Sequence, residues 1–183
     1  MNVVGLTGGI ASGKSFVSNY LKTKKIPVHE SDQVIKSIYK NPSSAFLLFL
    51  KKLGFKNAIK KKSINTREIR KEIFNDKNKK KIIEKYLHTE VRKNRDTFLK
   101  KHKNKKIVFL DIPLLFENNL DKTCNLVCTV IAPLRIRKAR AMNRVGMNKK
   151  ILEKIIRSQT HDIDRKKRSD FIIDTSKSRI KTC

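Results

Sequence analysis

The chain has 183 residues, of which 38% are hydrophobic and 33% charged, and its 45 Lys and Arg residues against 16 Asp and Glu residues give a formal net charge of +29. This length suits one compact α/β domain with a small insertion and excludes two full-sized domains. The first residues lack the basic and then apolar pattern of a signal peptide, and no apolar run approaches the ~18 residues of a membrane span. We therefore expect a cytoplasmic protein with no membrane partner.

The large positive charge has two interpretations. It is typical of proteins that bind nucleic acids or other polyanions, but it also arises where lysines cover solvated surfaces in general. The lysines stand in runs, as at residues 60–62, 79–81 and 105–106, and are not interleaved with the aromatic residues on which single strands stack. We therefore favour solvated lysines and expect no specific nucleic-acid partner.

The three cysteines, Cys124, Cys128 and Cys183, are an odd number, and their spacing matches neither a disulfide framework nor a zinc site. This usage is typical of a reducing compartment. Cys128 lies inside an apolar run, which favours a small buried hydrophobic residue over a metal ligand.

Residues 8–15, Gly-Gly-Ile-Ala-Ser-Gly-Lys-Ser, fit the phosphate-binding pattern of Gly, four residues, and Gly-Lys-Ser. Glycines let backbone N–H groups approach phosphate oxygens, Lys14 would reach the outer phosphates, and the Ser15 hydroxyl would hold Mg²⁺. A predicted strand at residues 3–7 and a predicted helix at residues 15–22 flank the loop, an arrangement that forms an anion site at a helix N-terminus. The expected nucleotide-binding residues of this segment are Gly8, Gly9, Ile10, Ala11, Ser12, Gly13, Lys14, Ser15 and Phe16.

A second short strand is predicted at residues 26–29, and the acidic residues Glu30 and Asp32 follow it. Open parallel sheets bind their ligands at the carboxyl ends of the strands. These carboxylates are therefore expected at the same edge of the sheet as the phosphate-binding loop.

Residues 33–104 are predicted to be helical and to insert between two strands of the sheet. Helices are expected from residue 33 to a break at residues 41–43, over residues 44–53, from a cap at Asn65, and over residues 77–101 behind a cap at Asn75 and Asp76. The expected buried side of the long helix comprises Ile82, Ile83, Tyr86, Leu87, Val91 and Phe98. A helical insertion beside a phosphate-binding loop suggests a lid or clamp for a substrate.

The sheet resumes with apolar segments that predict strands at residues 107–111, 126–131 and 171–173. Continuous apolar runs are typical of parallel strands covered on both faces. Pro133 suits the N1 position of a helix, and Asn148 is expected to cap another one. The first of these helices carries an arginine-dense face, whose planar guanidinium groups can brace phosphate oxygens. Its basic residues are Arg135, Arg137, Lys138, Arg140 and Arg144.

Together these residues resemble the dephospho-CoA kinase family over nearly the whole chain and in the right order. The resemblance is carried by residues 5–15, Ser31 and Asp32, Leu87 and His88, residues 113–118 (Pro-Leu-Leu-Phe-Glu-Asn), Arg140, Arg144, Gln159 and residues 169–174. The phosphate-binding loop alone is common to a superfamily, whereas the 113–118 segment and the Leu-His pair are more specific.

The resemblance implies a P-loop kinase fold, which is a three-layer α/β/α arrangement with a five-stranded parallel sheet, an inserted helical CoA domain and a small helical lid. The nucleotide-binding core would then comprise residues 1–32, 105–134 and 168–183, the CoA domain residues 33–104, and the lid residues 135–167. The implied reaction is the ATP-dependent phosphorylation of the ribose 3′-hydroxyl of dephospho-CoA, the final step of CoA biosynthesis. The implied small molecules are ATP, Mg²⁺ and dephospho-CoA, and the protein is expected to be a monomer or a weak oligomer.

Lys14, Asp32 and Arg140 are the catalytic residues that the resemblance implies. Asp32 would orient or deprotonate the attacking hydroxyl, or hold Mg²⁺ through a water molecule while Ser15 binds the ion directly; an Asp at this place also suits a helix N-cap. Lys14 and Arg140 would stabilise charge on the transferred phosphoryl group. Arg144 would bind the nucleotide, or it lies on a solvated helix face.

His88, Leu115 and Glu117 fall where the family builds its substrate side. A polar residue in a packed turn is the alternative interpretation of His88 and Glu117. Asp111, at the end of its predicted strand, is either an outer-shell magnesium residue or a structural one.

Three positions depart from the family pattern. Thr89 replaces a proline after the Leu-His pair, Glu30 replaces the commoner first aspartate, and Thr175 begins a segment where the family has an Asn-x-Gly turn. That turn is expected to shape the adenine pocket. We therefore expect this last departure to affect the affinity for the nucleotide and the stability of the core.

Two other functions remain open from the sequence. One is a P-loop kinase that acts on a nucleoside or nucleotide, which competition among acceptors would distinguish. The other is a basic nucleic-acid-binding protein that uses ATP as a switch; the net charge of +29 favours it, but the sequence contains no RNA-binding module.

Overall fold

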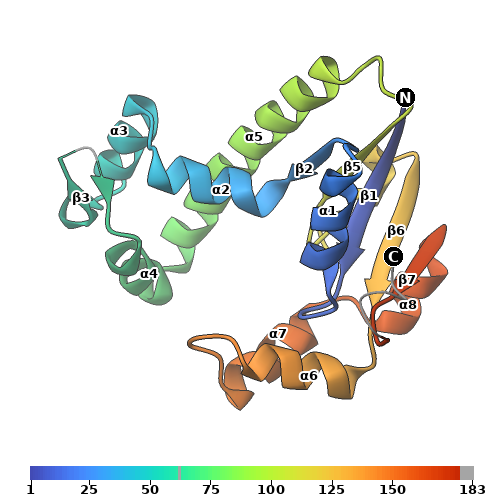
Figure 1. Ribbon diagram of the computed structural model, residues 1–183. Helices are drawn as coiled ribbons and strands as arrows, with labels where there is room; N and C mark the ends of the chain where they lie inside the picture. Colours follow the sequence, from blue (N-terminus) through green and yellow to red (C-terminus); the bar gives the residue numbers. More distant parts are fainter. Residues whose placement is uncertain (62, 178–183) are drawn as a thin grey trace. The chain divides into compact units, whose positions relative to one another are not determined.

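The structure is a computed structural model that describes residues 1–61 and 63–177 (Figure 1). Contacts between residues divide the chain into two compact units, Met1–His29 with His102–Cys183, and Glu30–Lys101. The last six residues of the expected core segment 168–183 lie outside the described residues.

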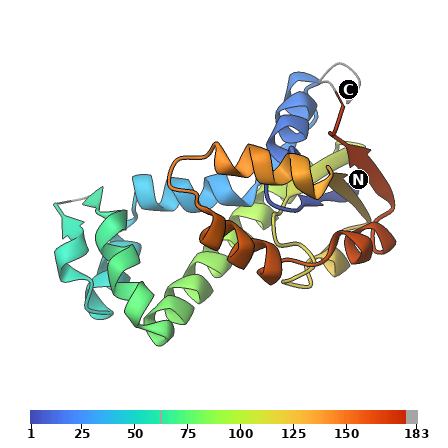
Figure 2. The same cartoon turned by 90° about the horizontal axis from the view of Figure 1, so that it is seen from below.

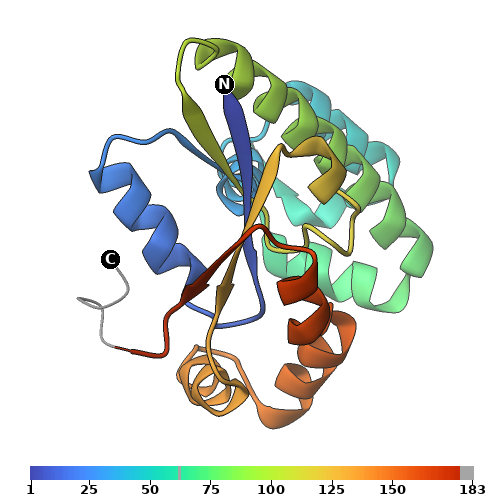
Figure 3. The ribbon, with the colours of Figure 1, turned by 90° about the vertical axis from the view of Figure 1, so that its right-hand side faces the viewer.

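The first unit is built on a five-stranded parallel sheet, as predicted. Its strands are β1 (Asn2–Gly8), β2 (Val28–Glu30), β5 (Ile107–Asp111), β6 (Leu126–Ile131) and β7 (Phe171–Asp174), in the order β2-β5-β1-β6-β7. The central strand β1 pairs in parallel register with β5 and β6, so that Val4 lies opposite both Phe109 and Leu126 (Figure 3). Every residue of β1 after Asn2 is buried, as expected for a central parallel strand that is covered on both faces.

The described residues of this unit also form the α-helices α1 (Lys14–Thr23), α6 (Leu134–Met142), α7 (Lys149–Ser158) and α8 (Asp162–Lys167). A short 3₁₀ turn, η2 (Asp121–Thr123), precedes β6. Val17 of α1 packs into the sheet core with Leu6 and Val130. Helices α6 and α7 lie side by side (Figure 2), and Ala141 and Leu152 join them in one buried cluster.

The starts of α6 and α7 test two predictions about caps. The Asn148 side chain accepts a hydrogen bond of 2.9 Å from the Ile151 amide, which confirms the predicted cap of α7. Pro133 is the N-cap of α6 and not its N1 residue, so that prediction is wrong by one position. Its ψ of 141° is extended, and the helix therefore begins only at Leu134.

The second unit comprises helices α2 (Ser31–Lys40), α3 (Ser44–Lys52), α4 (Thr66–Asn75) and α5 (Lys77–Lys101), with a 3₁₀ turn, η1 (Lys56–Ala58). Its core is separate from that of the sheet. Three aromatic rings from α3 and α5 stack in it, with centroids 5.1 Å apart for Phe46 and Tyr86 and 4.3 Å for Phe49 and Tyr86. The fully or nearly fully buried members are Phe46, Leu50, Phe55, Ala58, Ile69, Ile83 and Leu87.

Two expectations for this unit are wrong in detail. Residues 33–104 are not helical throughout, because strands β3 (Ile59–Lys60) and β4 (Ser63–Ile64) form an antiparallel pair. Strands of two residues leave no periodicity from which to predict them. On α5, Ile82 was expected on the buried side but is 44% exposed, since its neighbour Ile83 faces the core instead.

Among the described residues, no helix is long and apolar enough to cross a membrane. The longest, α5, has Lys or Glu residues along its whole length.

Cys128 lies in β6 and is 5% exposed, in agreement with its expected role as a small buried hydrophobic residue. Burial raises the pKa of its thiol to about 11. Since only the thiolate reacts with alkylating reagents, we expect iodoacetamide at pH 8 to leave Cys128 unmodified in the native protein and to modify it after unfolding in urea. Peptide mass spectrometry would measure this, and equal labelling in both states would contradict it.

Candidate active site

The glycine-rich loop joins the end of β1 to the start of α1. Gly13 is the N-cap of α1 with φ 91°, a left-handed conformation, and no side chain caps the helix. The loop is closed by a hydrogen bond of 3.1 Å from the Ser12 amide to the Gly9 carbonyl oxygen. The positive end of the helix dipole therefore faces the loop, as in phosphate-binding sites of this kind.

Two glycines of this loop are required by crowding. A Cβ atom added at Gly8 would lie 2.5 Å from the carbonyl oxygen of Val130, which belongs to the backbone of β6 and cannot move aside. A Cβ atom added at Gly13 would lie 2.9 Å from the hydroxyl oxygen of Thr175 and 3.1 Å from its Cβ and Cγ2 atoms. The glycine spacing of the sequence motif thus has a direct steric cause in the surrounding strands.

Lys14 forms an ion pair with Asp111, which ends β5 directly beside β1. The side chains are 15% and 6% exposed, respectively. Both residues were predicted at the ligand edge of the sheet, and the structure brings them together. An ammonium group held by a single carboxylate can exchange that partner for phosphate oxygens.

Arg140 of α6 also reaches the loop region, through Thr175 at the end of β7. Its Nη1 atom donates to the Thr175 hydroxyl at 3.1 Å and its Nη2 atom donates to the Thr175 carbonyl oxygen at 2.7 Å. The same hydroxyl donates to the carbonyl oxygen of Ser12 at 2.6 Å. Arg144, by contrast, is exposed beyond the end of α6.

A network of buried charges holds the other side of the loop. Arg137 and Arg165 are 5% and 1% exposed, and both pair with Asp162. Arg165 also donates to Glu117 Oε1 at 3.0 Å. Each buried arginine of the network thus has a carboxylate partner. Removing one member would leave an uncompensated buried charge, which is strongly destabilising.

Glu117, an expected substrate residue, lies inside this network. Its Oε1 atom also accepts a hydrogen bond of 2.7 Å from the Thr160 amide. Burial raises the pKa of Glu117, but the hydrogen bond from Thr160 and the charge of Arg165 outweigh that effect and hold the pKa below its ordinary value. The carboxyl group is therefore ionised at neutral pH.

The network contacts the loop at Gly9 and Ile10. A Cβ atom at Gly9 would lie 2.2 Å from Nη1 of Arg137 and 2.8 Å from Nη1 of Arg165, and the Ile10 amide donates to Gln159 Oε1 at 2.9 Å. Helices α6 and α8 and the end of α7 thus fix the loop from outside the sheet.

Sequence reasoning missed Arg137, Asp162 and Arg165 as members of the site. Arg137 was noted only as part of an arginine-dense face, since nothing in the spacing separates a buried arginine from its exposed neighbours. Gln159 belonged to the motifs but had no assigned role.

Leu115 is fully buried, and its two methyl groups lie 3.0 Å and 3.3 Å from the position of a Cβ atom at Gly5. Its side chain therefore packs against β1 and anchors the 113–118 segment there. Thr7 of β1 supports the same segment, because its hydroxyl donates to the Pro113 carbonyl oxygen at 3.2 Å.

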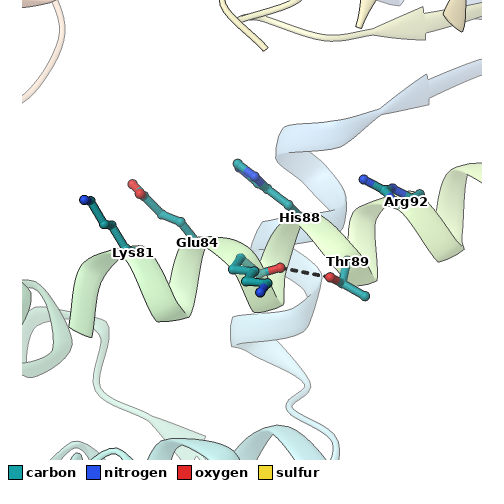
Figure 4. Close-up of a pocket in the computed structure, with 6 residues that line it drawn as sticks. Lys81, Glu84, His88, Thr89 and Arg92 are labelled. Atoms are coloured by element: carbon teal, nitrogen blue, oxygen red, sulfur yellow. Dashed lines mark hydrogen bonds between the residues drawn. The ribbon is translucent and has the colours of Figure 1, made fainter. Parts of the chain in front are cut away.

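The remaining predicted site residues belong to the second unit. Asp32 is exposed in the first turn of α2, whose N-cap is Glu30, so the N-cap interpretation of Asp32 is wrong by two positions. His88 lines a hollow of about 450 Å³ on α5. Figure 4 shows Lys81, Glu84 and Arg92 extending from the same side of the helix as His88, which makes this hollow predominantly cationic.

The strand order, the phosphate-binding loop and Lys14 define the class of P-loop kinases. A shikimate kinase from Acinetobacter baumannii shares the fold, with a TM-score of 0.51 at 12% identity over 97% of this chain and 86% of that one. A sequence model of the dephospho-CoA kinase family matches residues 2–180. The chain belongs to this family.

Individual relatives agree with the family model. A dephospho-CoA kinase of Bartonella quintana is 35% identical over 97% of this chain and 90% of its own length, and one of Fusobacterium nucleatum is 34% identical over 95% and 89%. The solved structure of a dephospho-CoA kinase from Campylobacter jejuni has a TM-score of 0.73 at 25% identity, covering 99% of this chain and 91% of that one. A crystal structure from Thermus thermophilus has a TM-score of 0.78 at 28% identity over 97% and 90%.

Proposed function

We propose that this chain transfers the γ-phosphoryl group of ATP to the ribose 3′-hydroxyl of dephospho-CoA and so forms CoA and ADP, the final step of CoA biosynthesis. The observation that carries the proposal is that two cations lie at the phosphate-binding loop. Lys14 is part of the loop sequence itself, and Arg140 is connected to the loop by hydrogen bonds through Thr175. These are the cations that phosphoryl transfer requires around the migrating group.

The donor side of the reaction follows from the loop. The backbone amides of Gly13 and of the first residues of α1, Lys14 and Ser15, would bind the β- and γ-phosphates, while the Ile10 and Ser12 amides hold the loop in shape. Lys14 would leave Asp111 and contact the γ-phosphate, and Arg140 would stabilise the charge that develops as the bond to ADP breaks. Arg144, exposed beyond α6, is free to approach the nucleotide from solvent.

The residues near the loop fit a magnesium ion of the kind that travels with ATP. Ser15 and Asp111 offer hydroxyl and carboxylate oxygens, which Mg²⁺ prefers, and no cluster of three His, Cys, Asp or Glu residues occurs among residues 1–61 and 63–177. Few protein ligands are expected when phosphate oxygens and water complete the coordination. Bound there, Mg²⁺ would neutralise charge on the phosphates; Ser15 would hold it directly and Asp32 through a water molecule.

On the acceptor side, Asp32 would accept the proton of the 3′-hydroxyl. His88 and the cationic hollow of α5 would attract the diphosphate of dephospho-CoA. Glu117 and the buried Leu115 belong to the 113–118 segment, which would form another part of the substrate side. The three-part division into core, CoA domain and lid belongs to the same proposal.

Competition among acceptors tests the substrate. With ATP and Mg²⁺, we expect ADP release to depend on dephospho-CoA, and adenosine, AMP and CMP to be poor acceptors that do not displace it. Preferred phosphorylation of a nucleoside or nucleotide would support the alternative kinase function instead.

Asp32→Asn tests the proposed base. We expect kcat for dephospho-CoA to fall by about 10²-fold or more, the usual contribution of general-base catalysis, with an unchanged melting temperature because Asp32 is exposed. Asp96→Asn is the matched control, as Asp96 is an exposed carboxylate of the same unit. Equal kcat values for both variants would remove Asp32 from the mechanism.

A further inference from the structure

Thr175 occupies a junction between three elements of the first unit. It follows β7 directly, is 5% exposed, and its amide donates to the Ile131 carbonyl oxygen of β6 at 2.9 Å. Its side chain faces the phosphate-binding loop, where Gly13 has no Cβ atom to displace it. This is also the position at which the sequence departs from the family's Asn-x-Gly turn.

The hydrogen bonds of Thr175 form a chain from α6 to the loop. A threonine hydroxyl has one proton to donate, and of its two possible acceptors the Ser12 carbonyl oxygen, at 2.6 Å, is closer than that of Ile131, at 3.2 Å. Its lone pairs are then available to Nη1 of Arg140 at 3.1 Å, while the backbone carbonyl oxygen takes Nη2 at 2.7 Å. Two bonds from one residue fix both the position and the plane of the guanidinium group.

We propose that Thr175 is the positioning residue for Arg140, and that its hydroxyl sets the guanidinium group relative to the phosphate-binding loop. The proposal rests on the function proposed above, in which Arg140 stabilises the transferred phosphoryl group. Because the hydroxyl contacts Ser12 and Arg140 at once, a movement of the loop on nucleotide binding reaches the arginine through a single side chain. Thr175 itself contacts no phosphate in this account.

Packing alone does not explain the arrangement. A valine would fill the same volume beside Gly13, and Arg140 would keep its bond to the Thr175 carbonyl oxygen. The hydroxyl adds only the link between the arginine and the Ser12 carbonyl oxygen. The contribution of that link should therefore appear in the rate of transfer and not in the folding of the sheet.

The test is Thr175→Val against Thr175→Ser in the full chain, assayed with ATP, Mg²⁺ and dephospho-CoA. We expect Thr175→Val to lower kcat about tenfold, the value of one hydrogen bond to a charged group, with KM for ATP nearly unchanged. Thr175→Ser keeps the hydroxyl and should restore kcat. Thr129→Val is the matched control, because Thr129 is another buried threonine whose hydroxyl bonds to Ser169 at 2.6 Å; it should leave kcat unchanged.

A double-mutant cycle with Arg140→Ala completes the test. If Thr175 acts through Arg140, adding Thr175→Val to Arg140→Ala causes no further loss of kcat. An equal loss in both backgrounds, a loss that Thr175→Ser does not restore, or a change confined to KM for ATP would overturn the proposal. A wild-type protein that turns over ATP but does not phosphorylate dephospho-CoA would instead contradict the proposed function, so the two failures are distinguishable.

Discussion

Replacement of Lys14 by methionine is expected to lower kcat by about 10³-fold, in the range seen when one preorganised charge-stabilising group is removed from a transition state. Methionine keeps the apolar stem of the side chain and removes the ammonium group. Lys14 is the first residue of α1 and pairs with Asp111 at the end of β5, whereas Lys22, the other lysine of the helix, lies in its last turn. Steady-state ADP release in the presence of dephospho-CoA would measure the loss.

The matched control for Lys14 is Lys22→Met, on the exposed face of the same helix. It changes the net charge by the same amount but should leave kcat unchanged. The comparison therefore separates an effect of net charge on kcat from the loss of the ammonium group at the site. Circular dichroism should show both variants folded. A Lys14→Met variant with the kcat of the control would exclude the loop as the site of phosphoryl transfer.

Gly13→Ala is expected to abolish activity and to destabilise the protein more than the same change at Gly54. Both glycines have φ 91°, so both variants incur the left-handed backbone penalty, about 1–2 kcal/mol in the free energy of unfolding. Only at Gly13 does the added Cβ atom also meet Thr175, at 2.9 Å from its hydroxyl oxygen; at Gly54 the nearest atom is Lys79 Nζ at 3.6 Å, the end of a flexible side chain.

Urea denaturation of the two variants measures the difference. The excess destabilisation of Gly13→Ala over Gly54→Ala reports the crowding against Thr175, and kcat should fall only in Gly13→Ala because Thr175 links the loop to Arg140. Equal unfolding free energies together with equal kcat values would mean that the loop tolerates the methyl group, which would contradict the steric account of the motif.

The sheet and the loop were predictable because their physical causes are local. The apolar runs at residues 107–111 and 126–131 are the observed bounds of β5 and β6, since a strand covered on both faces needs apolar residues at every position. The loop motif likewise predicted where α1 begins to within one residue, because a left-handed Gly13 is needed to enter the helix.

The residues that surround the loop were not predictable in the same way. Arg137 and Arg165 are 28 positions apart in sequence, and the fold brings both to Asp162 and to Gly9 of the loop; no local pattern marks a buried arginine. Thr175 was recognised only as a departure from the family pattern, and its bonds to Ser12 and Arg140 depend on three segments folding together. Partners that meet through tertiary structure leave no periodicity in the chain.

The helical unit shows the same division. The cap at Asp76, which accepts hydrogen bonds from the amides of Asn78 and Lys79 at 2.9 Å, and the bounds of α5 were predicted from sequence. The face of α5 that is buried was predicted less well, since Ile82 and Ile83 are adjacent and equally apolar. The choice between them depends on where α2 and α4 pack.

The most direct test of the proposed function is the identity of the phosphorylated product. The purified protein is incubated with Mg²⁺, dephospho-CoA and ATP labelled at the γ-phosphate, and the product is analysed by mass spectrometry and phosphorus NMR. We expect the label on the ribose 3′-hydroxyl, in CoA, with one ADP formed for each CoA. Label on another hydroxyl, or ADP release that does not depend on dephospho-CoA, would contradict the proposed function.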